Sequence, residues 1–279
     1  MTEATSGAGA TDTTISEISQ IGWFHSIDLG NGVVTSGISN NEVLGRPGAY
    51  PDVRGRSVLD IGAWDGKYSF KAEQEGAARV VALDHYIWQL DLPKREQYWR
   101  ECEAAGGVPD PDADSKFLSP DELPGRRGFD YAKAKLASSV EPVVADFMTT
   151  DLDALGVFDV VLYFGVLYHM LDPFAALRRL RRVTGEVAAI ETEAIRVLGY
   201  QGSALMGFLG GSELKRDHTN WYVPTDKALH EMCLAAGFRR VETKVGAPPF
   251  LNSHVRSRWR EGRLFGLIER YRTVVHAFP

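Results

Sequence analysis

The chain has 279 residues, of which 44% are hydrophobic and 24% are charged, an ordinary globular composition with enough length for one large α/β domain. Its formal net charge of −6 disfavours a nucleic-acid partner, because phosphate binding normally requires a basic surface. The only two cysteines, Cys102 and Cys233, lie far apart, and they fit a reduced intracellular protein better than a disulfide scaffold.

The first fourteen residues are mostly Ala, Gly, Ser and Thr, and they lack the charged and apolar regions of a signal peptide. We predict a disordered tail over residues 1–14 and an ordered lead-in or cap over residues 15–56. The main domain is expected over residues 57–279. No apolar run reaches the ~18 residues that a membrane span needs, so we expect a cytoplasmic protein without membrane contact.

From residue 57 the chain alternates apolar strand patterns with helical patterns. Strands are predicted at residues 57–61, 79–83, 140–145, 158–164, 186–191, 238–245 and 264–271. Helices are predicted at residues 66–76, 93–105, 129–137, 175–182 and 225–236. The alternation predicts a doubly wound, mostly parallel, seven-stranded sheet of the Rossmann-like class, with the last two strands as an antiparallel hairpin. Two long segments, 86–139 and 195–222, exceed a passive loop and are expected to be helical or loop cap insertions.

The turn after the first strand is the most informative stretch of the chain. It reads Gly-Ala-Trp-Asp-Gly over residues 62–66, just after Asp60, and the second strand ends at Asp84. A strand, a glycine turn, a helix and an acid-tipped strand form half of a nucleotide-binding unit, in which the second carboxylate can accept ribose hydroxyls. Trp64 and the carboxylates of Asp60 and Asp65 would hinder a pyrophosphate. The turn therefore favours a nucleoside with a cationic end, such as S-adenosylmethionine.

Polar residues follow most of the other predicted strands. In doubly wound sheets a ligand binds at the carboxyl ends of the strands, near the switch in strand order. The residues expected to converge at that edge are Asp60, Asp84, Asp146, Glu191 and the loop from Gly165 to Asp172.

Taken together, these motifs resemble the class I S-adenosylmethionine-dependent methyltransferases. The resemblance rests on residues 58–66, 81–84, 145–147 and 158–169. Two further stretches look like the branch typified by the tRNA wobble-uridine carboxymethyltransferases. They are Gly165-Val-Leu-Tyr-His with Asp172-Pro173, and Asn220-Trp-Tyr-Val-Pro-Thr with Ala236-Gly-Phe238. The similarity extends from about Trp23 to Lys244.

This resemblance implies a site for S-adenosylmethionine, with S-adenosylhomocysteine (SAH) as the product and no metal. The methionine part of the cofactor would be wrapped by Gly62, Ala63, Trp64 and Gly66 and lined by Phe164 and Gly165. Asp60 would meet the ammonium group, and Asp84, next to His85 in the cofactor-binding set, would hold the ribose. Asp146 would bond the adenine amino group while Phe147 packs on the adenine ring.

Tyr168, His169 and Glu191 are the candidate catalytic residues. His169 follows the fourth strand, where it can serve as a general base or as a structural histidine that bonds the loop backbone. Tyr168 can touch the methyl group or pack in the core, and Glu191 can orient the acceptor or pair with an arginine. The candidate substrate-binding residues are His25, Asn220 and Tyr222, with core packing as the alternative for the aromatic cluster around His25.

The stretch before the core bears on whether the enzyme transfers a carboxymethyl group or a methyl group. The wobble-uridine enzymes use a lysine there to bind the carboxylate of carboxy-S-adenosylmethionine, and residues 15–46 contain no lysine. Those enzymes also carry an N-terminal domain where this chain has only about fifty-six residues. We therefore expect plain methyl transfer to an O or N atom of a small-molecule acceptor, as in secondary metabolism or antibiotic biosynthesis, by a monomer or homodimer. The alternatives are a tRNA-modifying methyltransferase of that branch and a non-catalytic regulatory protein that binds S-adenosylmethionine.

Overall fold

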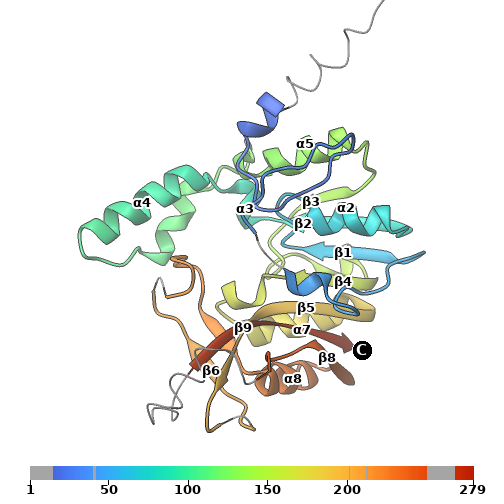
Figure 1. The fold of residues 1–279 in the computed structure, drawn as a ribbon, viewed down its shortest axis with the longest axis vertical. Coiled ribbons are helices and arrows are strands. Elements are labelled where there is room, and N and C mark those ends of the chain that lie inside the picture. The colour runs from blue at the N-terminus through green and yellow to red at the C-terminus, as the bar shows by residue number, and fades with distance from the viewer. Residues whose placement is uncertain (1–14, 40–41, 201, 212, 250–267) are drawn as a thin grey trace, which may run out of the picture.

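The structure is a computed structural model that describes residues 15–39, 42–200, 202–211, 213–249 and 268–279 (Figure 1). The tail predicted over residues 1–14 lies outside these ranges, and so does the start of the last predicted strand. No helix in the described ranges is long and apolar enough to cross a membrane.

Seven strands form one sheet in the order β3-β2-β1-β4-β5-β9-β8 (Figure 1). The strands are β1 (Ser57–Ile61), β2 (Arg79–Asp84), β3 (Glu141–Val144), β4 (Phe158–Phe164), β5 (Thr184–Val197), β8 (Arg240–Val245) and β9 (Ile268–Phe278). β1 to β5 pair in parallel, whereas β9 runs antiparallel to both β5 and β8. The predicted doubly wound sheet with a terminal antiparallel pair is confirmed. Two short strands, β6 (Met206–Phe208) and β7 (Tyr222–Pro224), form a separate antiparallel pair.

Helices cover both faces of the sheet. The α-helices are α2 (Lys67–Gln74), α3 (Tyr86–Gln89), α4 (Leu92–Ala104), α5 (Arg127–Lys135), α6 (Leu152–Leu155), α7 (Pro173–Val183) and α8 (Asp226–Ala235). The 3-10 turns are η1 (Glu42–Gly45), η2 (Pro111–Phe117), η3 (Pro124–Arg126) and η4 (Leu167–His169). α7 begins where Asp172 accepts the Ala175 N–H and Pro173 occupies the first turn, a pairing that favours helix initiation.

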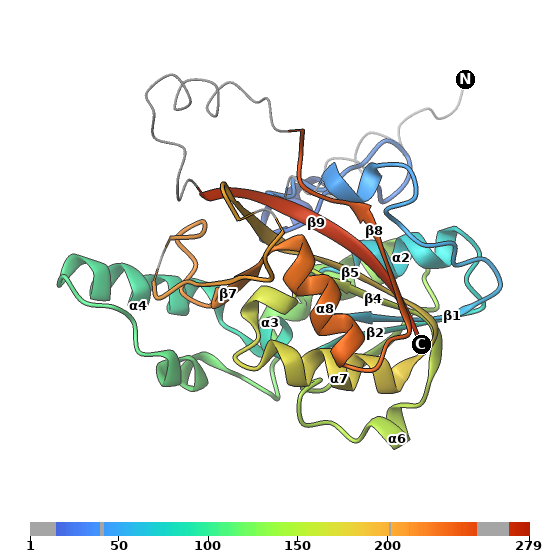
Figure 2. The same cartoon turned by 90° about the horizontal axis from the view of Figure 1, so that it is seen from below.

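Alternate residues of each central strand supply two hydrophobic cores. Val58 and Val160 face the core that contains α2, α5 and the lead-in, while Leu59 and Val161 face the core that contains α7 and α8 (Figures 1 and 2). β4 is buried on both faces because it lies in the middle of the sheet. This packing fixes the carboxyl ends of β1, β2, β4 and β5 along one edge.

Two sequence expectations needed correction. The fifth strand was expected to end at residue 191, but β5 continues to Val197, because β9 pairs with it as far as Ile268. The second insertion therefore begins later than predicted. The segment 86–139 was expected to be a cap, yet its last helix, α5, buries Phe129 and Ala132 against the sheet and belongs to the main layer.

Candidate functional site

The turn between β1 and α2 holds its shape through glycine. Gly62 has φ +75°, and a Cβ atom there would lie 2.6 Å from the Val166 side chain, so a larger residue would be strained and would clash with the loop after β4. Gly66 has φ +84° and a Cβ there would press on the rings of Phe70 and Phe129. The glycines therefore let the turn lie close to the loop after β4 and to helices α2 and α5.

Two buried carboxylates border this turn. Asp60 accepts a hydrogen bond from Ser69 Oγ at 2.6 Å, and Asp84 accepts the backbone N–H groups of Trp64 at 2.9 Å and Ile87 at 3.1 Å. Burial raises the pKa of each carboxyl to about 6, because a charge is poorly solvated inside the protein. A cationic or hydrogen-bond-donating ligand would compensate both charges.

Asp65 does not line the ligand side of the turn as the sequence suggested. Its buried carboxylate accepts the backbone N–H groups of Phe24 at 3.0 Å and His25 at 2.8 Å, and it contacts His25 Nδ1. Phe24 also stacks on Trp64, with ring centroids 4.0 Å apart. The lead-in is thereby fastened over the glycine turn, and the imidazole of His25 meets the ring of Tyr68.

Glu191 lies within β5, beside the end of β4, in a buried cluster of charges. Arg272 of β9 pairs with Glu191 at 2.5 Å and lies 3.7 Å from Glu193, and it donates to the Tyr168 hydroxyl at 2.9 Å. Lys215 reaches Glu193 at 3.4 Å. Burial raises the pKa of Tyr168, which keeps its phenol protonated. The arrangement matches the expectation that Glu191 can pair with an arginine; its contact with an acceptor stays a prediction.

His169 ends η4, directly after β4. Its Nδ1 lies 3.0 Å from the Thr219 carbonyl oxygen and 2.9 Å from Thr219 Oγ1, and that hydroxyl donates to Asp217 at 2.6 Å. Burial lowers the pKa of His169, and the nearby charge of Asp217 opposes this effect. The neutral imidazole is therefore the stable form near pH 7.

The two insertions meet above this edge. His218 lies edge-on to Trp99 of α4, with ring centroids 5.1 Å apart, and its Nε2 lies 3.1 Å from Glu103. Arg95 of α4 is buried, lies over Trp99 and donates to the Tyr86 hydroxyl at 2.7 Å. Figure 1 shows α4 on the side toward which the β1 arrow points. Residues from both insertions thus border the carboxyl edge.

Asp146 and Phe147, the residues expected to contact adenine, already have partners within the protein. Asp146 follows β3, and its two oxygens accept the Met148 N–H at 2.8 Å and the Thr149 hydroxyl at 3.0 Å. Phe147 is 6% exposed and packs against Tyr163 in the α7 core, so its ring faces the core instead of an open adenine pocket. His85 precedes α3 next to Asp84 and is half-buried. Adenine contacts of these residues stay predictions.

The remaining substrate candidates stand on the second insertion. Asn220 is buried, and its Nδ2 donates to the carbonyl groups of Leu214 at 2.9 Å and Asp217 at 3.0 Å, which holds the turn before it. Tyr222 begins β7, is half-buried and packs on Phe208. Contact of Asn220 and Tyr222 with a substrate stays a prediction, with which these interactions are compatible.

Several residues of the site carried no sequence signal of their own. They are Phe24, Tyr68, Arg95, Thr219 and Arg272. Arg272 of β9 forms an ion pair with Glu191. Phe24, Tyr68 and Thr219 act through partners that are distant in sequence, whereas Tyr86 and Trp99, the partners of Arg95, lie near it.

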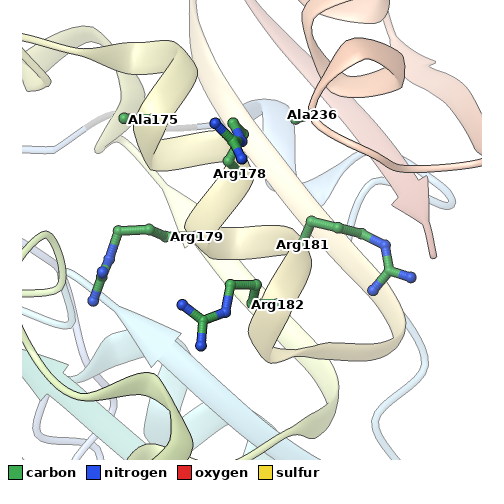
Figure 3. A pocket seen from close by; sticks show the side chains of 6 residues that line it. All are labelled: Ala175, Arg178, Arg179, Arg181, Arg182 and Ala236. Atoms are coloured by element: carbon green, nitrogen blue, oxygen red, sulfur yellow. The ribbon is translucent and has the colours of Figure 1, made fainter.

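Two surface hollows lie away from this edge. One, of about 350 Å³, is lined by Arg178, Arg179, Arg181 and Arg182 of α7 with two alanines (Figure 3). Arg179 and Arg181 point to opposite sides of the helix and donate to backbone carbonyls, and Arg182 pairs with Asp153. The other, of about 450 Å³, lies beside Tyr50 and His276. Within the described ranges no group of three His, Cys, Asp or Glu residues is arranged to hold a metal ion.

The chain is similar in sequence to known enzymes. No protein-family model matches the chain. The chain is 33% identical over 212 residues to a tRNA U34 carboxymethyltransferase of Dichelobacter nodosus, covering 74% of this chain and 53% of that protein. It is 24% identical over 190 residues to the enzyme of the same name from Alteromonas mediterranea, covering 68% and 46%. The chain thus spans about half the length of these curated relatives.

The solved structures agree on the fold. The N-terminal domain of EvdMO1 with SAH bound superposes with a TM-score of 0.57 at 17% identity, covering 97% of this chain and 96% of that one. The same domain in the presence of SAH and D-fucose gives a TM-score of 0.55 at 18% identity, covering 98% and 97%. The chain therefore has the fold of the class I S-adenosylmethionine-dependent methyltransferases and, within that class, resembles the tRNA wobble-uridine branch.

Proposed function

We propose that this protein is an S-adenosylmethionine-dependent methyltransferase whose acceptor is a small molecule. The observation that carries the proposal is the meeting of Asp60, the Gly62–Gly66 turn and Asp84 at the carboxyl edge of the sheet. Ligands of doubly wound sheets bind at this edge, next to the switch in strand order. That switch lies between β1 and β4 here.

The residues at this edge fit the cofactor chemically. Asp60 would hold the ammonium group, Asp84 the ribose hydroxyls, and the glycine turn the methionine backbone. Both carboxylates are buried, with a pKa raised to about 6, and each would be compensated by groups that donate hydrogen bonds. When bound, S-adenosylmethionine supplies an electrophilic methyl group, so the chain has to orient the acceptor and exclude water.

A small acceptor is favoured by how the edge is covered. The lead-in is fastened over the turn by Asp65, and the two insertions touch through Trp99 and His218. The net charge of −6 gives no general attraction for a polyanion. Secondary metabolism and antibiotic biosynthesis are the settings in which we place the reaction, with transfer to an O or N atom.

The transfer itself is the test. Protein is incubated with S-adenosylmethionine carrying a radioactive methyl group and a panel of sugars (D-fucose included), phenols and amines. SAH and labelled acceptor are then separated by chromatography. We expect label on one class of small acceptor and an equal amount of SAH. Cofactor binding without turnover on any acceptor would favour a regulatory protein, and absence of cofactor binding would refute the proposal.

A tRNA acceptor is the second candidate, and the similarity to tRNA U34 carboxymethyltransferases favours it. It predicts a shifted tRNA band in a native gel at physiological salt and label transferred to bulk tRNA. Carboxy-S-adenosylmethionine is added in a parallel reaction, because those enzymes transfer a carboxymethyl group. Labelled tRNA with unlabelled small acceptors would replace the first proposal by this one.

Cofactor affinity should depend on pH through the two buried carboxylates. Because the charged forms would bind the ligand, protonation below a pKa of about 6 should weaken binding. Between pH 7.5 and pH 5 we expect affinity for S-adenosylmethionine to fall about tenfold for each carboxylate that must lose its proton. Calorimetry in two buffers of different ionisation enthalpy would also detect proton release near pH 6. An affinity that is constant over this range would contradict these roles.

A further inference from the structure

The tautomer of His169 is fixed by its neighbours. Nδ1 faces the Thr219 carbonyl oxygen at 3.0 Å, and a carbonyl oxygen can only accept a hydrogen bond. The Thr219 hydroxyl donates its own proton to Asp217, so it too presents a lone pair to Nδ1 at 2.9 Å. Nδ1 must therefore carry the proton, and in the neutral ring Nε2 holds the lone pair.

Asp217 anchors this arrangement from behind. One carboxylate oxygen accepts both the Thr219 hydroxyl at 2.6 Å and the Thr219 backbone N–H at 2.9 Å. A carboxylate joined to an imidazole through a hydroxyl stabilises the imidazolium that forms when Nε2 takes a proton. The chain His169–Thr219–Asp217 is thus built to make Nε2 a better proton acceptor.

Nε2 is available for a ligand. Within the described part of the chain Nε2 has no hydrogen-bond partner, and the half-buried side chain of His169 leaves this atom accessible. His169 follows β4 at the carboxyl edge, next to Tyr168. The charged groups that act on it are Asp217 of the second insertion, Arg95 of α4 and Arg272 of β9.

We propose that His169 is the general base that accepts a proton from a hydroxyl group of the acceptor, and that Thr219 and Asp217 are positioning residues that hold and polarise it. This inference rests on the proposed function, because it needs a methyl donor with a sulfonium group. It adds the base, its supporting residues and the class of acceptor.

The step balances without another reactant. The acceptor oxygen forms a bond to the methyl carbon, and the electron pair of the carbon–sulfur bond goes to sulfur, which becomes a neutral thioether. The acceptor proton passes to Nε2, so His169 becomes an imidazolium, and this proton is lost to water after product release. Sulfonium and hydroxyl thus give thioether, ether and one proton.

The chemistry of a general base favours a hydroxyl over an ammonium acceptor. An amine near pH 7 is mostly cationic, and it must lose a proton before its nitrogen has a lone pair that can attack the methyl group. A hydroxyl is neutral and already has lone pairs, and its oxygen becomes a stronger nucleophile as its proton passes to Nε2. The base therefore selects a phenol or an alcohol.

The first test needs no cofactor and no acceptor. The pKa of His169 is measured by NMR of ring-labelled histidine in the free protein, with His169→Gln to assign the signal and His230→Gln as the matched histidine control. We expect a pKa below the ordinary value, an Nδ1–H tautomer, and a further fall in Asp217→Asn and Thr219→Val. Thr219→Val keeps the carbonyl that fixes the tautomer and removes only the link to Asp217.

The outcome is decisive in either direction. An Nε2–H tautomer, or a pKa that neither variant changes, would overturn the relay whether or not the protein is an enzyme. Asp153→Asn, which alters an exposed surface carboxylate, is the control for Asp217→Asn and should leave the pKa of His169 unchanged. If Asp217→Asn fails to fold, Thr219→Val alone decides.

The second test separates this inference from the proposed function. With the acceptor found in the transfer assay, His169→Gln should lower kcat about 100-fold, the scale of lost general-base catalysis, with unchanged SAH affinity. Asp217→Asn should lower kcat about tenfold and move the acidic limb of the kcat profile to lower pH. Thr219→Val should match Asp217→Asn, and the double variant should add nothing. Methyl transfer that persists in His169→Gln would refute the base while leaving the methyltransferase intact.

Discussion

Replacing Asp84 by alanine is expected to weaken binding of S-adenosylmethionine and SAH by about 1–3 kcal/mol, the scale of charge-assisted hydrogen bonds lost from a buried carboxylate. Asp84 ends β2 at the carboxyl edge and accepts the backbone N–H of Trp64 in the glycine turn. Titration calorimetry of both ligands at pH 7.5 measures the change directly.

A second variant at Asp84 is needed to separate loss of the ligand contact from loss of support for the turn. Asp84 also accepts the Trp64 and Ile87 N–H groups, so alanine removes support from the turn as well as a ligand contact. Asp84→Asn keeps an acceptor oxygen for the turn and loses the charge, and we expect it to fall between wild type and Asp84→Ala. Asp153→Ala is the exposed control. Unchanged affinity in both Asp84 variants would remove Asp84 from the cofactor site.

Replacing Asp65 by alanine should destabilise the fold by about 3–5 kcal/mol, as expected when a buried carboxylate is removed and several donors lose their acceptor. Its 2% exposed carboxylate accepts the Phe24 and His25 N–H groups and contacts His25 Nδ1, so alanine would leave three buried donors without an acceptor. Urea unfolding gives the loss in free energy of unfolding.

Hydrogen exchange locates the same loss. If Asp65 fastens the lead-in over the glycine turn, the Phe24 and His25 amides should exchange much faster in Asp65→Ala. Asp28→Ala, at an exposed carboxylate of the same lead-in that accepts only the Gly30 N–H, should change stability by less than about 1 kcal/mol. Equal stability of the two variants would show that the lead-in does not depend on Asp65.

Asp60 and Asp84, the two carboxylates expected to bind the ligand, also affect the stability of the free protein. Asp60 and Asp84 have pKa values raised to about 6 in the fold, against 3.8 for an ordinary aspartate. A raised carboxyl pKa means that their contribution to stability is greatest below the ordinary value and is lost as the pH rises through 6. At neutral pH the two buried charges therefore lower the stability of the free protein, and a bound cofactor that compensates them would raise it.

The sequence predicted the central strands well because their signal is local. β1 and β4 match the predicted bounds at both ends, since continuous apolar runs flanked by turn residues identify strands buried on both faces. The extension of β5 to Val197 was missed because it depends on pairing with β9, a strand about eighty residues later along the chain. Its last residues are partly polar, and their pattern alone does not indicate a strand.

The residues of the site also differ in whether their sequence signal is local. Residues that belong to the strand ends, such as Asp60 and Asp84, follow from the motif and its place in the sheet. Their supports do not, because Asp65 meets Phe24 across 41 positions, Thr219 meets His169 across 50, and Arg272 meets Tyr168 across 104. A single sequence carries no signal for such pairs, which only the folded chain brings together.

A crystal structure of the protein with SAH tests the central claim most directly. We expect SAH at the carboxyl edge, with its ribose hydroxyls on Asp84, its ammonium group near Asp60 and its methionine chain along the Gly62–Gly66 turn. The sulfur should face the space bordered by Tyr168 and His169. SAH bound elsewhere, or no SAH in crystals soaked well above the measured dissociation constant, would contradict it.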